Sequence, residues 1–118
     1  MSTRETADAF TKLLKANKHE DAAKKFNAKN IVSIEAMDGP MARVEGAAAV
    51  KKKSDWWYAN NTVHSVTTEG PYVNGDQFTV RFAMDITDKQ SGKRTQMQEV
   101  AIYTVSKTGK IKEERFFY

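Results

Sequence analysis

The feature that most constrains this chain is the alternation of apolar and polar residues from 77 to 87. A period of two residues is the pattern of a β-strand with one buried face. An Asn74-Gly75 pair, a strong hairpin signal, comes just before this segment. The segment is therefore predicted to be a strand of an antiparallel sheet. Its apolar face consists of Phe78, Val80, Phe82, Met84 and Ile86.

Strand and turn signals continue on both sides of this segment. Further strands are predicted at 62–69, 94–105 and 110–118, with a break at Gly70-Pro71 and a turn at Thr108-Gly109. These segments form an antiparallel meander of four long strands.

The first half of the chain is mainly helical in its pattern. Ser2 and Glu5 have the spacing of a capping box, which predicts a helix start, and a short second helix follows. A strand is predicted at 30–37, and a third helix runs from Gly46 to the Asn60-Asn61 pair. The order predicts an α+β fold with three helices on one face of a bent sheet.

Length and composition indicate a single globular domain spanning residues 1–118. Hydrophobic residues make up 40% of the chain and charged residues 29%, which is the usual balance for such a domain. There is no cysteine, which excludes disulfides and Cys-ligated zinc and fits a reducing compartment. With no apolar leader or membrane-length apolar run, we expect a cytoplasmic protein without membrane contact.

The net charge of +4 does not by itself indicate nucleic-acid binding. The only run of basic residues is Lys51–Lys53, and the five arginines are scattered. Nucleic-acid modules cluster Arg and Lys near exposed aromatics. We interpret the lysine run as a solvated helix face and expect no nucleic-acid partner.

Three stretches resemble the SnoaL-like branch of the NTF2-like superfamily: "VEGAAAVKKKSDWWYANN", "EGPYVNGDQFTVRFAMDIT" and "GKRTQMQEVAIYTVSKTGKIKEERFFY". The resemblance covers nearly the whole chain and implies a cone-shaped α+β fold. Members include polyketide cyclases, ketosteroid isomerases, epoxide hydrolases and dehydratases. Cyclases and isomerases place an aspartate at the end of the first strand, where this chain has Glu35 and Ala36.

The resemblance also implies a homodimer joined through the sheet. The outer face of the sheet is expected to carry Val100, Ile102 and Ile86, which is more apolar surface than a solvated face usually exposes.

Glu99 lies in the middle of an otherwise strand-like segment. If the preceding turn is centred on Gln90 and Ser91, Glu99 lies opposite Phe82 and faces the most apolar side of the sheet. Burial there would raise its pKa, as a general acid or base requires. The alternative is a structural contact with Arg94, Arg115 or a tyrosine.

Three other residues are candidates for catalytic groups. Tyr103 shares the face of Glu99. Its hydroxyl could polarise a carbonyl group, or the ring could pack in the core with the hydroxyl in contact with water. Glu35 is a second carboxylate in an apolar strand. His64 could face the cavity as a proton shuttle or lie on the surface. It forms no pair with His19 at ligand spacing, so no metal site is predicted.

Apolar side chains from several elements are candidates for ligand contacts. Trp56 and Trp57 end the third helix, where they could stack on a flat ligand or pack in the core. The other candidates are Phe82, Met97 and Phe116.

Two functional hypotheses follow. One is a cofactor-free enzyme that transfers a proton on a small apolar carbonyl compound through Glu99 or Glu35. The other is a non-catalytic module that binds a ligand or another protein. A carboxylate bridged to Arg115, or a pocket filled by aromatic side chains, would favour the second hypothesis.

Overall fold

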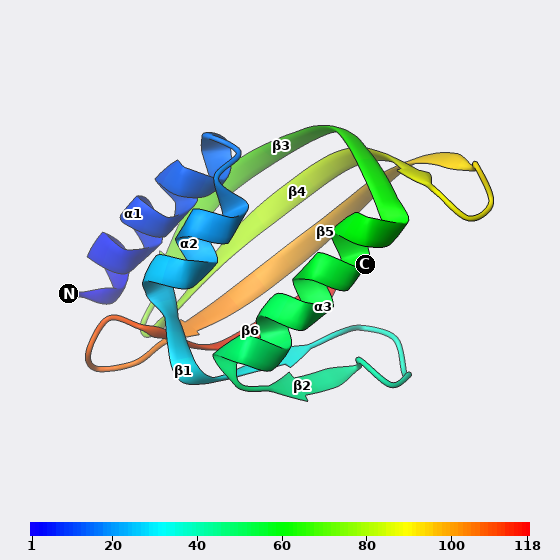
Figure 1. The fold of residues 1–118 in the computed structure, drawn as a ribbon. Coiled ribbons are helices and arrows are strands. Elements are labelled where there is room, and N and C mark those ends of the chain that lie inside the picture. Colours follow the sequence, from blue (N-terminus) through cyan, green and yellow to red (C-terminus); the bar gives the residue numbers. More distant parts are fainter.

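The computed structural model describes all 118 residues, with three helices packed against one face of a curved six-stranded sheet (Figure 1). The helices are α1 (Thr3–Lys15), α2 (His19–Phe26) and α3 (Ala47–Asn60). The strands are β1 (Asn27–Ile34), β2 (Arg43–Glu45), β3 (Asn61–Asn74), β4 (Gln77–Asp88), β5 (Arg94–Val105) and β6 (Ile111–Phe117). The predicted α+β fold is confirmed.

The sheet is mostly antiparallel, with strand order β2-β1-β6-β5-β4-β3. The last four strands form the predicted meander, while β1 pairs in parallel with β6. This pairing brings the end of β1 beside the last strand of the chain, so residues far apart in sequence meet at one end of the sheet.

The register of β4 and β5 is the predicted one. Phe82 pairs with Glu99, and Phe78 pairs with Tyr103. Because side chains alternate between faces, this register fixes which residues of both strands point toward the helices.

Helix α1 begins at the predicted capping box, in which Ser2 and Glu5 exchange side-chain and backbone hydrogen bonds. Its apolar side is buried against the sheet, and the Phe10 ring contacts the rings of Phe78 and Tyr103. These contacts close one end of the space between the helices and the sheet.

Four details differ from the sequence predictions. Strand β1 ends at Ile34, so Glu35 lies just after the strand and not within it, and the short strand β2 was not predicted. Strand β3 continues through Gly70-Pro71 with a register shift there, so that pair bends the strand instead of ending it. Ile86 was counted both with the apolar face of its strand and on the outer face; it lies two residues after Met84 in an unbroken strand, so it belongs to the inner side.

None of the three helices has the length and apolar character needed to cross a membrane.

Candidate functional site

A cavity of about 260 Å³ lies between the helices and the inner face of the sheet. Twenty residues line it, of which 13 are hydrophobic. All three helices and every strand except β2 contribute to its wall. A largely apolar pocket with a few polar groups is the usual form of a small-molecule site.

Glu99 faces this cavity from β5. Burial, followed by the negative charges of Glu35 and Glu114, raises the pKa of Glu99 to about 7, and Lys53 acts weakly in the opposite direction. The two arginines considered as partners are engaged elsewhere, Arg94 with Asp85 and Arg115 with Glu113. Glu99 is therefore an acid held near neutral pKa without a neutralising arginine.

Tyr103 lies four residues further along β5, on the same face, and also lines the cavity. Its ring stacks on Phe78, with ring centres 5.0 Å apart. Burial, and then the charges of Glu114 and Glu99, raise the pKa of Tyr103 well above its ordinary value. The phenol therefore keeps its proton at all physiological pH values and remains a hydrogen-bond donor.

Glu35 reaches the cavity from the end of β1 and meets Lys53 of α3. The Lys53 Nζ lies 3.7 Å from the Glu35 carboxylate and donates a hydrogen bond of 2.7 Å to Ser33 Oγ. The ammonium also lies over the Phe116 ring, 5.3 Å from its centre. Lys53 was predicted to belong to a solvated run, but only Lys51 and Lys52 are on the exposed side of α3.

Glu114 of β6 is a third carboxyl group on the cavity wall. It accepts a 3.0 Å hydrogen bond from Ser33 Oγ, and burial is the main cause that raises its pKa. Sequence reasoning missed Ser33, Lys53 and Glu114. Glu114 had a readable signal, because it is two residues from Phe116 and so shares its face.

The aromatic candidates form much of the remaining wall. Trp56, Trp57, Phe82 and Phe116 all line the cavity. Trp56 is 53% exposed, so it stands at the border with solvent and does not fill the interior. The space between these rings stays open.

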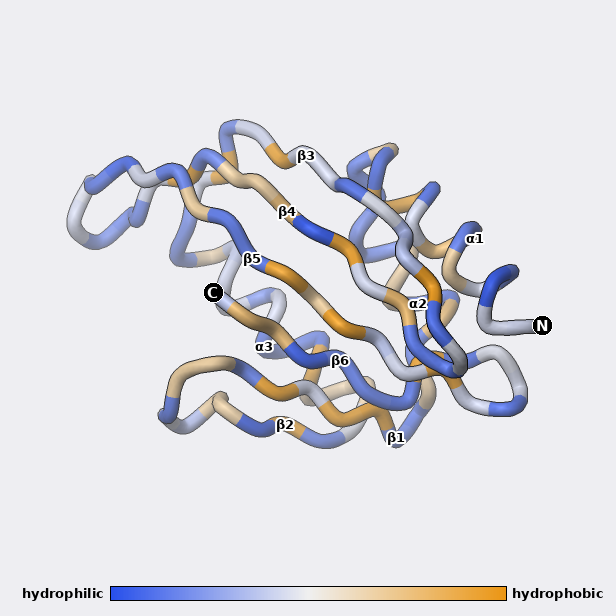
Figure 2. The backbone as a smooth tube through the Cα atoms, turned by 180° about the vertical axis from the view of Figure 1, so that it is seen from behind, coloured by the Kyte–Doolittle hydropathy of each residue, from blue (hydrophilic) through white to orange (hydrophobic).

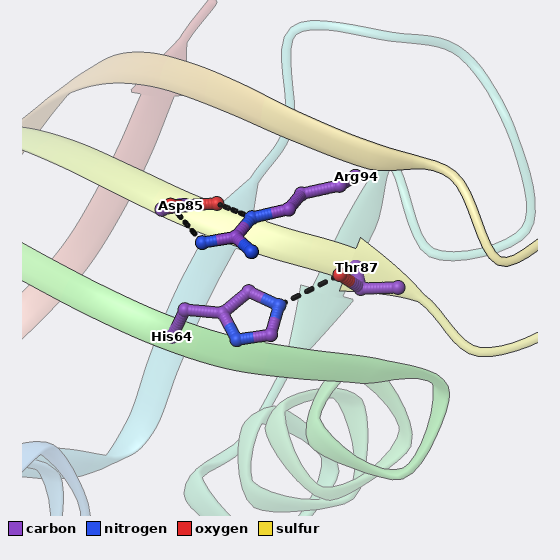
Figure 3. Close-up of polar contacts among 4 residues, drawn as sticks. All are labelled: His64, Asp85, Thr87 and Arg94. Atoms are coloured by element: carbon purple, nitrogen blue, oxygen red, sulfur yellow. Dashed lines mark hydrogen bonds and ion pairs between the residues drawn. The ribbon is translucent and has the colours of Figure 1, made fainter.

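Two candidate residues are not part of this cavity. Met97 pairs with Met84 nearer the β4–β5 hairpin and lines a separate pocket. His64 was considered as a cavity proton shuttle, but it is exposed and hydrogen-bonds Thr87 Oγ1 at 2.7 Å (Figure 3). Thr87 is two residues from Asp85, so both side chains lie on the outer face of β4. Arg94 of β5 donates two hydrogen bonds to the Asp85 carboxylate. No group of three or more His, Asp or Glu side chains is arranged to hold a metal ion.

Comparison with known proteins shows which protein family and which solved structures this chain resembles. The family model for the SnoaL-like domain matches residues 1–118. A Mesorhizobium loti protein, proposed to be a SnoaL-like polyketide cyclase, is 52% identical over 100% of both chains, with a TM-score of 0.97. No curated protein matches the sequence.

More distant structures share the fold at low sequence identity. A proposed isomerase from Bacillus subtilis is 16% identical with a TM-score of 0.77, covering 98% of this chain and 88% of its own. The Mycobacterium tuberculosis protein RV0760c, in complex with estradiol-17β-hemisuccinate, is 19% identical with a TM-score of 0.72. That match covers 100% of this chain and 95% of the other.

Proposed function

Because the chain belongs to the SnoaL-like domain family, we propose that its cavity binds a small apolar carbonyl compound and catalyses proton transfer on it without a cofactor. The observation that carries this proposal is the Glu99 carboxyl group, which faces an apolar cavity with a pKa of about 7. A general acid or base works best when its pKa lies near the operating pH.

In the proposed reaction, the Glu99 carboxylate takes a proton from a carbon next to the carbonyl group. The electrons of that C–H bond form the carbon–carbon double bond of an enolate, and the carbonyl oxygen takes the negative charge. Tyr103 lines the same cavity and donates its O–H to that oxygen. Glu99 then returns the proton to the same carbon or to a more distant one, so no oxidant or reductant is consumed.

The charged groups around the two candidate carboxylates favour Glu99 over Glu35 as the base. Glu35 has the Lys53 ammonium at 3.7 Å, whereas Glu99 has no such partner. Of the two carboxylates considered from sequence, Glu99 is thus the one whose charge is less compensated, and we assign it the proton transfer.

The test is deuterium exchange at the methyl group of 6-acetyl-2-naphthol in D₂O, followed by proton NMR. Wild type should accelerate exchange, with a rate that rises as pH increases through about 7, because the base must be ionised. Glu99→Gln should abolish the acceleration. Tyr103→Phe keeps the stacked ring and should slow exchange about 100-fold.

Glu45→Gln serves as the matched control, because Glu45 is an exposed glutamate on β2 and should leave the rate unchanged. Binding of the ketone without any Glu99-dependent exchange would reject the catalytic proposal and leave the cavity as a binding site.

We further propose a homodimer joined through the outer face of the sheet. Val100 of β5 pairs with Phe117 of β6, which is 47% exposed, and Ile102 lies two residues along the same face. Figure 2 views the molecule from this side, with β5 and β6 side by side in the sheet.

A further inference from the structure

Ser33 of β1 is fully buried and takes no part in the proposed proton transfer, yet it contacts two charged groups of the cavity wall. Its Oγ atom lies 2.7 Å from Lys53 Nζ and 3.0 Å from Glu114 Oε2. Strand β6 lies between β1 and β5, so Glu114 is paired with Ser33 on one side and with Tyr103 on the other (Figure 2). Ser33 thus connects the single lysine of the cavity wall to one of its three carboxyl groups.

The donors and acceptors of this connection have a fixed direction. A lysine ammonium has no acceptor, so Lys53 donates to Ser33 Oγ. The hydroxyl has one proton of its own, and Ser33 donates it to Glu114 Oε2. A proton on that oxygen would leave the buried serine O–H without an acceptor, which is unfavourable. The contact therefore favours the ionised form of Glu114.

We propose that Ser33 is a positioning residue of the site, whose hydroxyl, oriented by Lys53, keeps Glu114 as the ionised carboxylate and leaves Glu99 as the carboxyl group that exchanges its proton. This inference rests on the proposed function, because it explains why Glu99 and not Glu114 acts as the base. The two carboxyl groups line the same cavity, so ionisation of one opposes ionisation of the other.

The directions of the pKa shifts agree with this assignment. Burial raises the pKa of Glu114, whereas the Ser33 hydrogen bond and the Lys53 charge lower it. No hydrogen bond lowers the pKa of Glu99, where burial acts first and the charges of Glu35 and Glu114 act in the same direction. The contact at Ser33 is thus a difference between the two groups that favours ionisation of Glu114 first.

Six other titratable groups lie near these two carboxyl groups, and the variants described below leave all of them unchanged. They are Glu35 after β1, His19 of α2, Lys53 and Tyr58 of α3, Tyr103 of β5 and Tyr118 after β6. Burial raises the pKa of each of these tyrosines and lowers that of His19, so all four are uncharged at pH 7. A shift in the titration of Glu99 therefore reports on Ser33 and Glu114.

The direct test is Ser33→Ala, followed by side-chain carboxyl ¹³C NMR from pH 4 to 9. Loss of the hydroxyl should raise the titration midpoint of Glu114 and lower that of Glu99, each by about one pH unit, as expected for one hydrogen bond to a charged group. The midpoint of the pH–rate profile for deuterium exchange on 6-acetyl-2-naphthol should fall with that of Glu99. Lys53 should stay in place, because Glu35 at 3.7 Å and the Phe116 ring at 5.3 Å also hold it.

Three further variants test whether Ser33 acts through Glu114. Glu114→Gln removes the charge that opposes ionisation of Glu99, so it should also lower the Glu99 midpoint, and Ser33→Ala added to it should cause no further shift. Ser33→Thr keeps the hydroxyl and should keep the wild-type midpoint. Thr11→Val is the matched control, because it removes a buried hydroxyl of α1 that has no hydrogen-bond partner, and it should leave both midpoints unchanged.

The possible outcomes separate this inference from the proposed function. A Glu99 midpoint near pH 7 in both wild type and Ser33→Ala would overturn the role of Ser33 and leave the proposed function intact. A further shift in the double variant would overturn the route through Glu114. If Ser33→Ala does not fold, an unchanged Glu99 midpoint in Glu114→Gln would overturn the inference instead. The expected shifts without any deuterium exchange would support the role of Ser33 and reject only the catalysis.

Discussion

At the scale of the residue, the Glu99 carboxyl group is where stability and function oppose each other. Its pKa rises from an ordinary value of 4.5 to about 7 in the folded protein. Between these two pH values the folded state binds more protons than the unfolded state. Stability therefore falls as pH rises through this window, and the full cost is present above pH 7.

Replacing Glu99 with Gln removes this cost while keeping the side-chain shape. The rise of the Glu99 pKa from 4.5 to about 7 corresponds to about 3 kcal/mol in the free energy of unfolding. We expect Glu99→Gln to match wild type near pH 4.5 and to be more stable by up to about 3 kcal/mol at pH 8. Urea unfolding at both pH values measures the difference, with Glu45→Gln as the control.

The groups facing Glu99 enter this experiment as well. Glu35, Glu114 and Lys53 act on its pKa from the end of β1, from β6 and from α3, so the variant also relieves the repulsion between carboxylates. A variant clearly less stable than wild type at pH 8 would mean that the carboxylate is a structural partner, and it would count against a catalytic role for Glu99.

The position of Glu99 was predictable from sequence, whereas the contacts of Lys53 were missed. The two-residue alternation of the strand, together with the assumed centre of one hairpin turn, was enough to place Glu99 opposite Phe82. Lys53 lies three residues after Val50 and four before Trp57, which is the spacing of a single helix face. That signal was hidden because three consecutive lysines look like a solvated surface.

At the scale of the element, strands with strict alternation and helices with explicit caps were predicted well. Both patterns are local, so a short window of sequence specifies them. The parallel pairing of β1 with β6 joins opposite ends of the chain, and no local pattern specifies it. The Ser33–Glu114 hydrogen bond depends on that pairing, so it too could not be predicted.

Strand β3 shows how a turn signal can be overridden by pairing. Gly70 adopts a positive φ of 119°, and a Cβ there would lie 2.9 Å from the Thr79 carbonyl oxygen of β4. Only glycine fits this close backbone approach. Pairing with β4 resumes at Tyr72, so the Gly70-Pro71 pair produces an irregularity within one strand.

At the scale of the whole molecule, the apolar residues on the outer face of the sheet lead us to predict self-association. Val100, Ile102 and Phe117 form an apolar group on the side opposite the helices. Light scattering at micromolar concentration should give twice the chain mass of 13.3 kDa. Ile102→Lys should shift the protein to monomer, because it places a charge within the interface.

Thr95→Lys is the control for this change, since Thr95 is already exposed at the hairpin end of the same strand. A monomer mass for wild type, or a dimer unaffected by Ile102→Lys, would reject the proposed interface.

The proposed function depends on one property of the molecule, an acid of near-neutral pKa inside the cavity. Side-chain carboxyl ¹³C NMR can follow all eight glutamates across pH 3 to 9, with the Glu99→Gln spectrum identifying the resonance of Glu99. We predict that this resonance titrates with a midpoint near pH 7. A midpoint near 4.5, the ordinary value for glutamate, would contradict the role assigned to Glu99.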